Sequence, residues 1–287
     1  MTRRVVVVRA PNHLGDGVMA RPAVAALARV ADVIVHAPPW ALHLYGDLPV
    51  RLRPRGRLED GDVAVLLAPS LRAAWEARHL PVRIGTPTDH RAWLLTHAVP
   101  GARHTADTYA RLARFAGAGE VGEAPTLALA GGEAPPEVPQ GHLALNPLSA
   151  RGAVREWKGW AELARRSPHP VVFYGGPGER ERLATVAAGF PTQVGLPLPA
   201  LAAALRRARL MVSVDTGPAH FARAVGVPTL VIHGSTDPAG SGPAGALAVQ
   251  GEASCRPCYG RRCHNGTLAC LDLPVSTVWR ATEAALG

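Results

Sequence analysis

The sequence predicts an α/β protein built from two doubly wound Rossmann-like domains. Short runs rich in valine, leucine and isoleucine alternate with stretches of helical composition through most of the 287 residues. These runs are continuously apolar, as expected of parallel strands that are covered on both faces. The alternation is interrupted between residues 119 and 141 by a glycine- and proline-rich segment typical of a linker. We therefore expect a first domain at 1–130, a linker at 131–141 and a second domain at 142–287.

The first domain opens with four consecutive valines in the predicted strand 4–9. A polar loop at 11–17 leads into a helix that ends near Arg29, and Pro22 is expected in its first turn because proline disrupts a helix interior. Ser70 is placed to cap a later helix. The remaining predicted elements of this domain are strands at 33–36, 63–68 and 82–84 and helices at 71–79 and 107–115.

The second domain repeats the same alternation and closes with an amphipathic helix. Its predicted strands lie at 143–146, 171–174, 193–195, 210–214 and 229–233. Its predicted helices lie at 157–166, 179–188, 201–208, 218–225 and 275–286.

Composition narrows the classes of function. The formal net charge of +9 suggests acidic partners, such as nucleic acid, an anionic membrane surface or a phosphorylated substrate. Lys158 is the only lysine, and the arginines are spread along the chain rather than gathered in a tail. Four tyrosines and four phenylalanines offer little base stacking, so we expect no nucleic-acid partner. No apolar run approaches the roughly 18 residues of a membrane span, and the first residues do not resemble a signal peptide, so a cytoplasmic protein is expected.

Residues 209–238 form the stretch around which the second domain is organised. A strand, a helix and a second strand follow one another there, and the first turn contains Asp215, Thr216, Gly217 and Pro218. A helix that begins at the carboxyl end of a parallel strand presents free N–H groups and a partial positive charge, which favours a phosphate. Ala219 and His220 complete the predicted site. The alternative is that Thr216 is only a helix cap and His220 only a core or surface histidine.

Four segments in the same order resemble glycosyltransferase family 9, which includes the lipopolysaccharide heptosyltransferases. They are Asn-His-Leu-Gly-Asp at 12–16, Asn-Pro at 146–147 with Arg-Glu-Trp at 155–157, Val-Asp-Thr-Gly-Pro-Ala-His at 214–220 with Gly-Ser-Thr-Asp-Pro at 234–238, and a cysteine-bearing tail at 255–264. The resemblance implies a GT-B arrangement, with the active site in a cleft between the domains. It also implies an inverting, metal-independent transfer of heptose or a related sugar. The donor would be a nucleotide-diphosphate sugar such as ADP-heptose.

By resemblance, Asp16 is the base that deprotonates the acceptor, although an aspartate at this place could equally cap the following helix. Arg155 stands where the family has a lysine, and Lys158 where it usually has proline. Either side chain, with Arg151, could hold the leaving diphosphate, and the alternative is a solvated helix start. Asn146 is placed on the donor side.

Gly175 and Gly176 form a second turn between a strand and a helix, where backbone could approach the nucleotide. Neither this turn nor the loop at 12–17 has the spacing of a dinucleotide fingerprint, which argues against an NAD-dependent dehydrogenase.

All four cysteines lie close together near the end of the chain, at Cys255, Cys258, Cys263 and Cys270, with His264 among them. Their gaps match no standard zinc motif closely, so structural zinc, disulfides and free thiols all remain open. No cofactor is expected to take part in catalysis.

The acceptor implied by the resemblance is an anionic glycan or glycolipid of lipopolysaccharide-core type, reached by peripheral contact with the inner membrane surface. Arg51, Arg53, Arg55 and Arg57 could meet its anionic groups, or could be a solvated strand edge. Two other functions stay open: a catalytically inactive nucleotide-sugar binding module, and a sugar-nucleotide epimerase of the same architecture.

Overall fold

The computed structural model describes residues 3–129 and 131–287. The chain divides into two compact units, Met1–Leu127 and Ala128–Gly287. The end of the predicted first domain, residue 130, lies outside the described residues, and the predicted linker at 131–141 belongs to the second unit. None of the described helices is long and apolar enough to cross a membrane.

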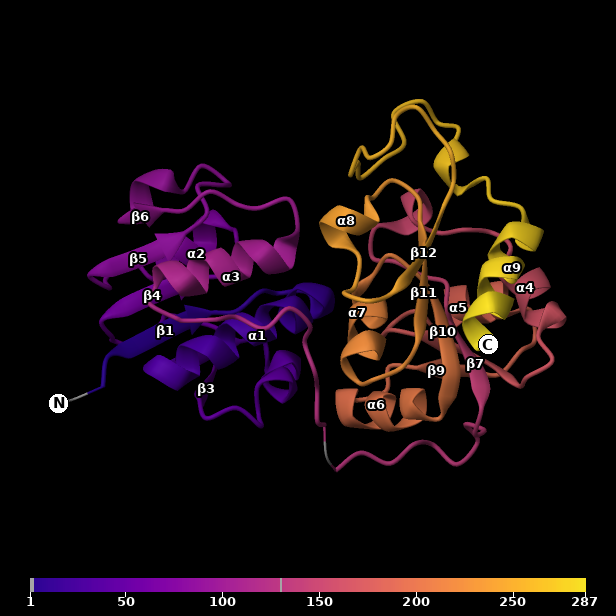
Figure 1. Ribbon diagram of the computed structural model, residues 1–287, viewed down its shortest axis with the longest axis horizontal. Helices are drawn as coiled ribbons and strands as arrows, with labels where there is room; N and C mark the ends of the chain where they lie inside the picture. Colours follow the sequence, from indigo (N-terminus) through magenta and orange to yellow (C-terminus); the bar gives the residue numbers. More distant parts are fainter. Residues whose placement is uncertain (1–2, 130) are drawn as a thin grey trace. The chain divides into compact units, whose positions relative to one another are not determined.

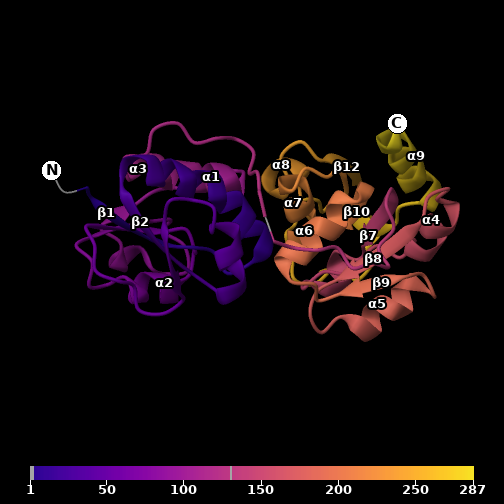
Figure 2. The same ribbon diagram turned by 90° about the horizontal axis from the view of Figure 1, so that it is seen from below.

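The first unit is a parallel sheet of six strands in the order β3-β2-β1-β4-β5-β6. The strands are β1 (Val5–Arg9), β2 (Asp32–Ala37), β3 (Arg51–Pro54), β4 (Val63–Leu66), β5 (Val82–Gly85) and β6 (His97–Ala98). The helices are α1 (Leu14–Val30), α2 (Leu71–Glu76) and α3 (Thr105–Phe115), with 3-10 turns η1 (Pro39–Leu44) and η2 (Ala92–Leu94). Figure 2 shows α1 and α3 on one side of the sheet and α2 on the other.

The second unit has the same design, with the strand order β12-β11-β10-β7-β8-β9 (Figure 1). Its strands are β7 (His142–Asn146), β8 (Val171–Gly175), β9 (Thr192–Val194), β10 (Ala208–Val214), β11 (Thr229–His233) and β12 (Leu247–Gln250). Its helices are α4 (Trp160–Arg166), α5 (Arg180–Ala187), α6 (Leu198–Arg206), α7 (Gly217–Ala224), α8 (Pro238–Ser241) and α9 (Val275–Leu286), with 3-10 turns η3 (Gly152–Val154) and η4 (Ala269–Leu271).

Each sheet has its own hydrophobic core. In the first unit, Val7 of β1 lies beside Ile34 of β2 and Ala64 of β4, and all three are buried under α2. In the second unit, Trp157, Trp160 and Leu163 pack in one core with strand residues and with Val278 of α9. The two parallel sheets confirm the predicted α/β class of two doubly wound units.

Several predicted boundaries are wrong. Helix α1 begins at Leu14, so Pro22 lies in its interior rather than in its first turn. Proline removes one helical N–H there, but α1 is buried along most of its length, and this packing outweighs the local preference. Helix α4 begins at Trp160 rather than at 157, and α6 begins at Leu198 rather than at 201. Strands β3, β6 and β12 were not among the predicted elements.

Candidate functional site

The predicted phosphate site lies where the strand order of the second sheet reverses. Strands β7 and β10 are neighbours there, and the chain runs outward from them in opposite directions. In open α/β sheets, ligands bind outside the carboxyl ends of the strands at such a point. Helix α7 begins directly after β10, with Thr216 as its N-terminal flanking residue and Pro218 in its first turn. The side chain of Thr216 makes no capping hydrogen bond, so the reading of this residue as only a cap is not supported.

Four side chains form what we call the strand-end cluster: Asp215, Arg155, His233 and Ser241. Asp215 is 3% exposed, and its Oδ2 accepts a hydrogen bond from the Ser241 hydroxyl at 3.1 Å. Arg155 Nη1 lies 2.8 Å from the Asp215 backbone oxygen and 3.3 Å from its Oδ2. The guanidinium group is therefore fixed beside the start of α7, where the carboxylate of Asp215 offsets its positive charge.

His233 is a member of this cluster that the sequence analysis missed. It is buried, its Nδ1 lies 3.1 Å from the Thr236 hydroxyl and 3.9 Å from Asp215 Oδ2, and its burial lowers the pKa of the ring while Asp215 opposes that shift. Val214 pairs with Ile232 in the sheet, and this register makes Asp215 and His233 neighbours at the ends of adjacent strands. Register between strands is a tertiary property, so sequence alone does not reveal it.

The other predicted donor residues differ in what they can do. Asn146 is 2% exposed, its amide nitrogen donates to the Tyr174 backbone oxygen, and its Oδ1 accepts from Ser213, so its side chain joins three strands. Ala219 and His220 are also buried in α7. Arg151 and Lys158 are exposed.

The turn at Gly175 and Gly176 is hydrogen-bonded to the side chain of Glu179. The Gly176 N–H donates to Glu179 Oε2 at 2.7 Å, and a β-carbon at Gly175 would meet Leu183 at 3.1 Å. Glycine keeps the backbone open at this strand end, and Glu179 adds a carboxylate to it.

The predicted base lies in the first unit. Asp16 is in the first turn of α1, not in the preceding loop, because the helix begins earlier than predicted. The residue before the helix, His13, makes no side-chain capping bond, and Asp16 is not the capping residue. Two tyrosines are close to it. Burial raises the pKa of Tyr45 and Tyr109, and the negative charge of Asp16 adds to both shifts. The Tyr45 hydroxyl donates to the Gly17 backbone oxygen at 3.0 Å, which fixes this turn of the helix.

Of the three states left open for the cysteine tail, structural zinc is not supported. Within residues 3–129 and 131–287, no three His, Cys, Asp or Glu side chains are placed to hold a metal ion together. Cys255, Cys258, Cys263 and Cys270 are all free thiols, which also sets the disulfide alternative aside. The Leu268 N–H donates to Cys263 Sγ at 3.4 Å, and this bond lowers the pKa of the thiol, whereas burial raises the pKa of Cys270.

Arg256 attaches this tail to the sheet. Its guanidinium group donates to the backbone oxygens of Gly234, Thr236 and Gly251. The loop after β11 is thereby held next to the strand-end cluster, so the tail supports the site structurally.

Comparison with known proteins places this geometry in a family. Residues 51–269 match the model of glycosyltransferase family 9 (heptosyltransferase). The chain is 37% identical over 113 residues to lipopolysaccharide heptosyltransferase 1 of Pseudomonas aeruginosa, a segment that covers 36% of this chain and 32% of that protein. The matched segment therefore spans about a third of the length of this curated relative.

Solved structures resemble the chain over nearly its whole length. E. coli ADP-heptose lps heptosyltransferase II superposes with a TM-score of 0.78 at 18% identity, covering 100% of this chain and 98% of that one. The family 9 glycosyl transferase of Veillonella parvula gives 0.75 at 20% identity, covering 99% and 97%. E. coli heptosyltransferase WaaC with ADP gives 0.73 at 17% identity, covering 98% and 99%. These similarities show the GT-B fold, and the family model adds membership: the chain belongs to glycosyltransferase family 9, the heptosyltransferase family.

Proposed function

We propose that this protein is an inverting, metal-independent heptosyltransferase that uses ADP-heptose as donor and a sugar of lipopolysaccharide-core type as acceptor. The observation that carries the proposal is the start of α7 at the strand-order reversal, with Arg155 fixed beside it by Asp215. Family membership supports the reaction class. The similar enzyme WaaC has been solved with ADP and with ADP-2-deoxy-2-fluoro heptose, which supports this donor.

In this proposal, the first turn of α7, at Gly217, Pro218 and Ala219, faces the diphosphate together with Thr216 and His220. The Gly217 N–H is the backbone donor, because the Ala219 N–H already donates to the Thr216 backbone oxygen at 3.1 Å. Proline has no N–H, so Pro218 contributes only a preset backbone angle. The guanidinium group of Arg155 is held in place by Asp215, and the exposed Lys158 and Arg151 are the alternative phosphate contacts. Gly175 and Gly176 let the nucleoside approach the backbone, where the carboxylate of Glu179 can accept hydrogen bonds from ribose hydroxyls.

Transfer then follows as a single displacement. The acceptor oxygen bonds to C1 of the heptose as the bond from C1 to the phosphate oxygen breaks, and Asp16 accepts the proton from the acceptor hydroxyl. ADP leaves with both electrons of the broken bond. The helix terminus and the arginine stabilise its growing charge, which is the role that a metal ion has in other transferases. Attack from the face opposite to ADP inverts the configuration at C1.

The proposal is tested by heptose transfer from ADP-heptose to lipopolysaccharide lacking heptose, followed by mass spectrometry. We expect Asp16→Asn to reduce turnover by about 10²–10⁴-fold, since it removes the base and keeps the shape. The same variant should keep the thermal shift that ADP produces, and UDP and GDP should produce smaller shifts. Full turnover by Asp16→Asn would reject the base, and isomerised donor in a reaction without acceptor would identify an epimerase instead.

We also propose that the acceptor is anionic and that the enzyme reaches it at an anionic membrane surface. Arg51, Arg55 and Arg57 are exposed around the edge strand β3, whereas Arg53 is paired with Glu59. Trp75 and Trp93 are 51% and 70% exposed, and tryptophan favours the membrane interface. Vesicles with and without phosphatidylglycerol provide the test. Sedimentation with the anionic vesicles alone is expected, and Trp75→Ser with Trp93→Ser should weaken it.

A further inference from the structure

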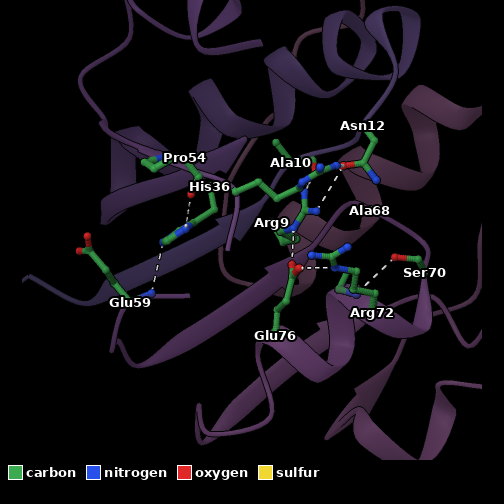
Figure 3. Close-up of polar contacts among 12 residues, drawn as sticks. Arg9, Ala10, Asn12, His36, Pro54, Glu59, Ala68, Ser70, Arg72 and Glu76 are labelled. Carbon is green, nitrogen blue, oxygen red and sulfur yellow. Dashed lines mark hydrogen bonds and ion pairs between the residues drawn. The ribbon is translucent and has the colours of Figure 1, made fainter. Parts of the chain in front are cut away.

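Asn12 occupies a fixed position just before α1, four residues before Asp16 in the sequence. Its Oδ1 lies 3.2 Å from Arg9 Nη2 and 3.4 Å from Arg55 Nη1. A guanidinium group can only donate hydrogen bonds, so two of them require the oxygen of the amide to face them. This chemistry determines which way the amide is turned, and Figure 3 shows the oxygen on the side of Arg9.

Arg9 cannot reorient to release Asn12. It is 1% exposed at the end of β1, its Nε donates to Glu76 Oε2 at 2.7 Å, and its Nη1 donates to the Ala10 backbone oxygen at 2.6 Å. Glu76 is held from its other side, because its Oε1 accepts from Arg72 Nε at 3.0 Å. A buried ion pair satisfied at both ends is costly to break, so β1, α2 and the segment before α1 are joined by this network (Figure 3).

The same geometry leaves one polar group unused. Asn12 is exposed, and its Nδ2 makes no hydrogen bond to any of the described residues. Figure 3 shows this nitrogen on the side of the amide that faces away from Arg9. An amide that is oriented on one side and free on the other is suited to donate to a ligand oxygen.

We propose that Asn12 contacts the acceptor and donates from Nδ2 to one of its oxygen atoms, with Arg9 and Glu76 as positioning residues. This inference rests on the proposed transferase function. The acceptor is the partner in question because Asn12 lies on the same short segment as Asp16, which takes the acceptor's proton. A second fixed contact beside the base would hold the reacting hydroxyl in the orientation that proton removal requires.

Asn12→Asp is the decisive variant. It keeps the shape and still accepts from both arginines, but it replaces the N–H donor by an oxygen. Using lipopolysaccharide lacking heptose as the acceptor, we expect its KM to rise about 10-fold or more, as for loss of one hydrogen bond with an added repulsion. The KM for ADP-heptose and the thermal shift with ADP should stay within twofold of wild type. Asn12→Ala should raise the acceptor KM less than Asn12→Asp.

Arg9→Lys tests the positioning role. Lysine retains the charge beside Glu76 but lacks the second N–H that reaches Asn12, so the acceptor KM should rise. Combined with Asn12→Asp, it should add little, because both changes act through one contact. A purely structural Arg9 would instead lower the unfolding temperature, leave the acceptor KM unchanged and give additive effects in the double variant.

The outcomes separate this inference from the function on which it rests. If wild type transfers heptose and Asn12→Asp has the wild-type acceptor KM, the contact is rejected and the proposed function stands. If both KM values change together in Asn12→Asp, the residue acts on the whole site and the specific contact is also rejected. If wild type binds no ADP and transfers no heptose, the proposed function fails, and this inference fails with it.

Discussion

At the scale of single residues, the neighbouring tryptophans Trp157 and Trp160 form a matched pair. Both are buried, and their rings meet edge to face at 5.4 Å. Trp157 Nε1 donates to the Leu273 backbone oxygen at 2.9 Å, whereas Trp160 Nε1 has no partner among the described residues. Phenylalanine removes the N–H at either position and leaves a similar void. We expect Trp157→Phe to cost more stability than Trp160→Phe, by about 1 kcal/mol or more, because an unpaired buried N–H is itself unfavourable.

Urea unfolding of Trp157→Phe and Trp160→Phe tests this expectation, because the two variants should have different midpoints. Leu183→Ala, a change in the same core without a hydrogen bond, is a useful reference for the cost of a void. Equal losses in the two tryptophan variants would mean that the hydrogen bond of Trp157 contributes nothing measurable.

His36 makes stability depend on pH. It is buried between two backbone partners: one ring nitrogen lies 3.2 Å from the Pro54 oxygen, and the other accepts from the Glu59 N–H at 3.2 Å (Figure 3). Burial lowers the pKa of His36 from its ordinary value of 6.5. The unfolded chain therefore binds a proton at a higher pH than the folded one. This contribution to stability is present above pH 6.5 and is lost as the pH falls toward the folded pKa.

His36→Gln removes this titration. Unfolding midpoints at pH 7.5 and pH 5 should differ less in the variant than in wild type. A remaining difference is expected, because burial also lowers the pKa of His142 and His233. An unchanged difference would show that His36 does not contribute to acid sensitivity.

At the scale of elements, the start of α2 depends on a cap that the sequence predicts correctly. Ser70 Oγ accepts from the Ala73 N–H at 3.2 Å, and Asp89 accepts from the Leu71 N–H at 2.6 Å. Ser70→Ala should cost about 1 kcal/mol and lower the unfolding temperature, since a free helical N–H is left. Ser70→Thr keeps a hydroxyl at the same place and should recover most of the loss. A Ser70→Ala variant as stable as Ser70→Thr would contradict the capping role.

Helix α1 shows the limit of local rules at this scale. Pro22 predicts a helix start near residue 21, yet the helix begins at Leu14 and passes through the proline. Gly17 explains part of the difference, because a β-carbon there would lie 2.8 Å from the Leu44 side chain. The packing of α1 against η1 is a tertiary contact, and helix propensities do not include such contacts. The consequence for function is that Asp16 stands on a rigid helical turn instead of a loop.

At the scale of the whole molecule, the two units should respond differently to nucleotide. All proposed donor residues lie in the second unit, so hydrogen exchange with saturating ADP should slow at 215–220 and 234–241. At 100 times its Kd, a ligand stabilises the state that binds it by about 2.7 kcal/mol. Segment 9–17 of the first unit serves as the internal control and should not be protected by ADP in the absence of acceptor. Protection of residues 9–17 alone would place the donor site in the first unit and contradict the proposal.

The sequence by itself determined the α/β class, most strands and helices, the strand-end position of Asp215 and Thr216, and the resemblance to family 9. These follow from local patterns, because a parallel strand buried on both faces must be apolar and a helix start needs particular residues.

The tertiary structure decided which distant residues meet. Arg155 pairs with Asp215 and Arg9 pairs with Glu76, each across about 60 or more residues of chain. It also left the four cysteines as separate thiols and made Asn146 a strand connector rather than an open ligand contact. Such pairings depend on strand order and register. The apolar pattern that predicts a strand is the same whatever its position in the sheet, so the sequence does not reveal which strands are neighbours.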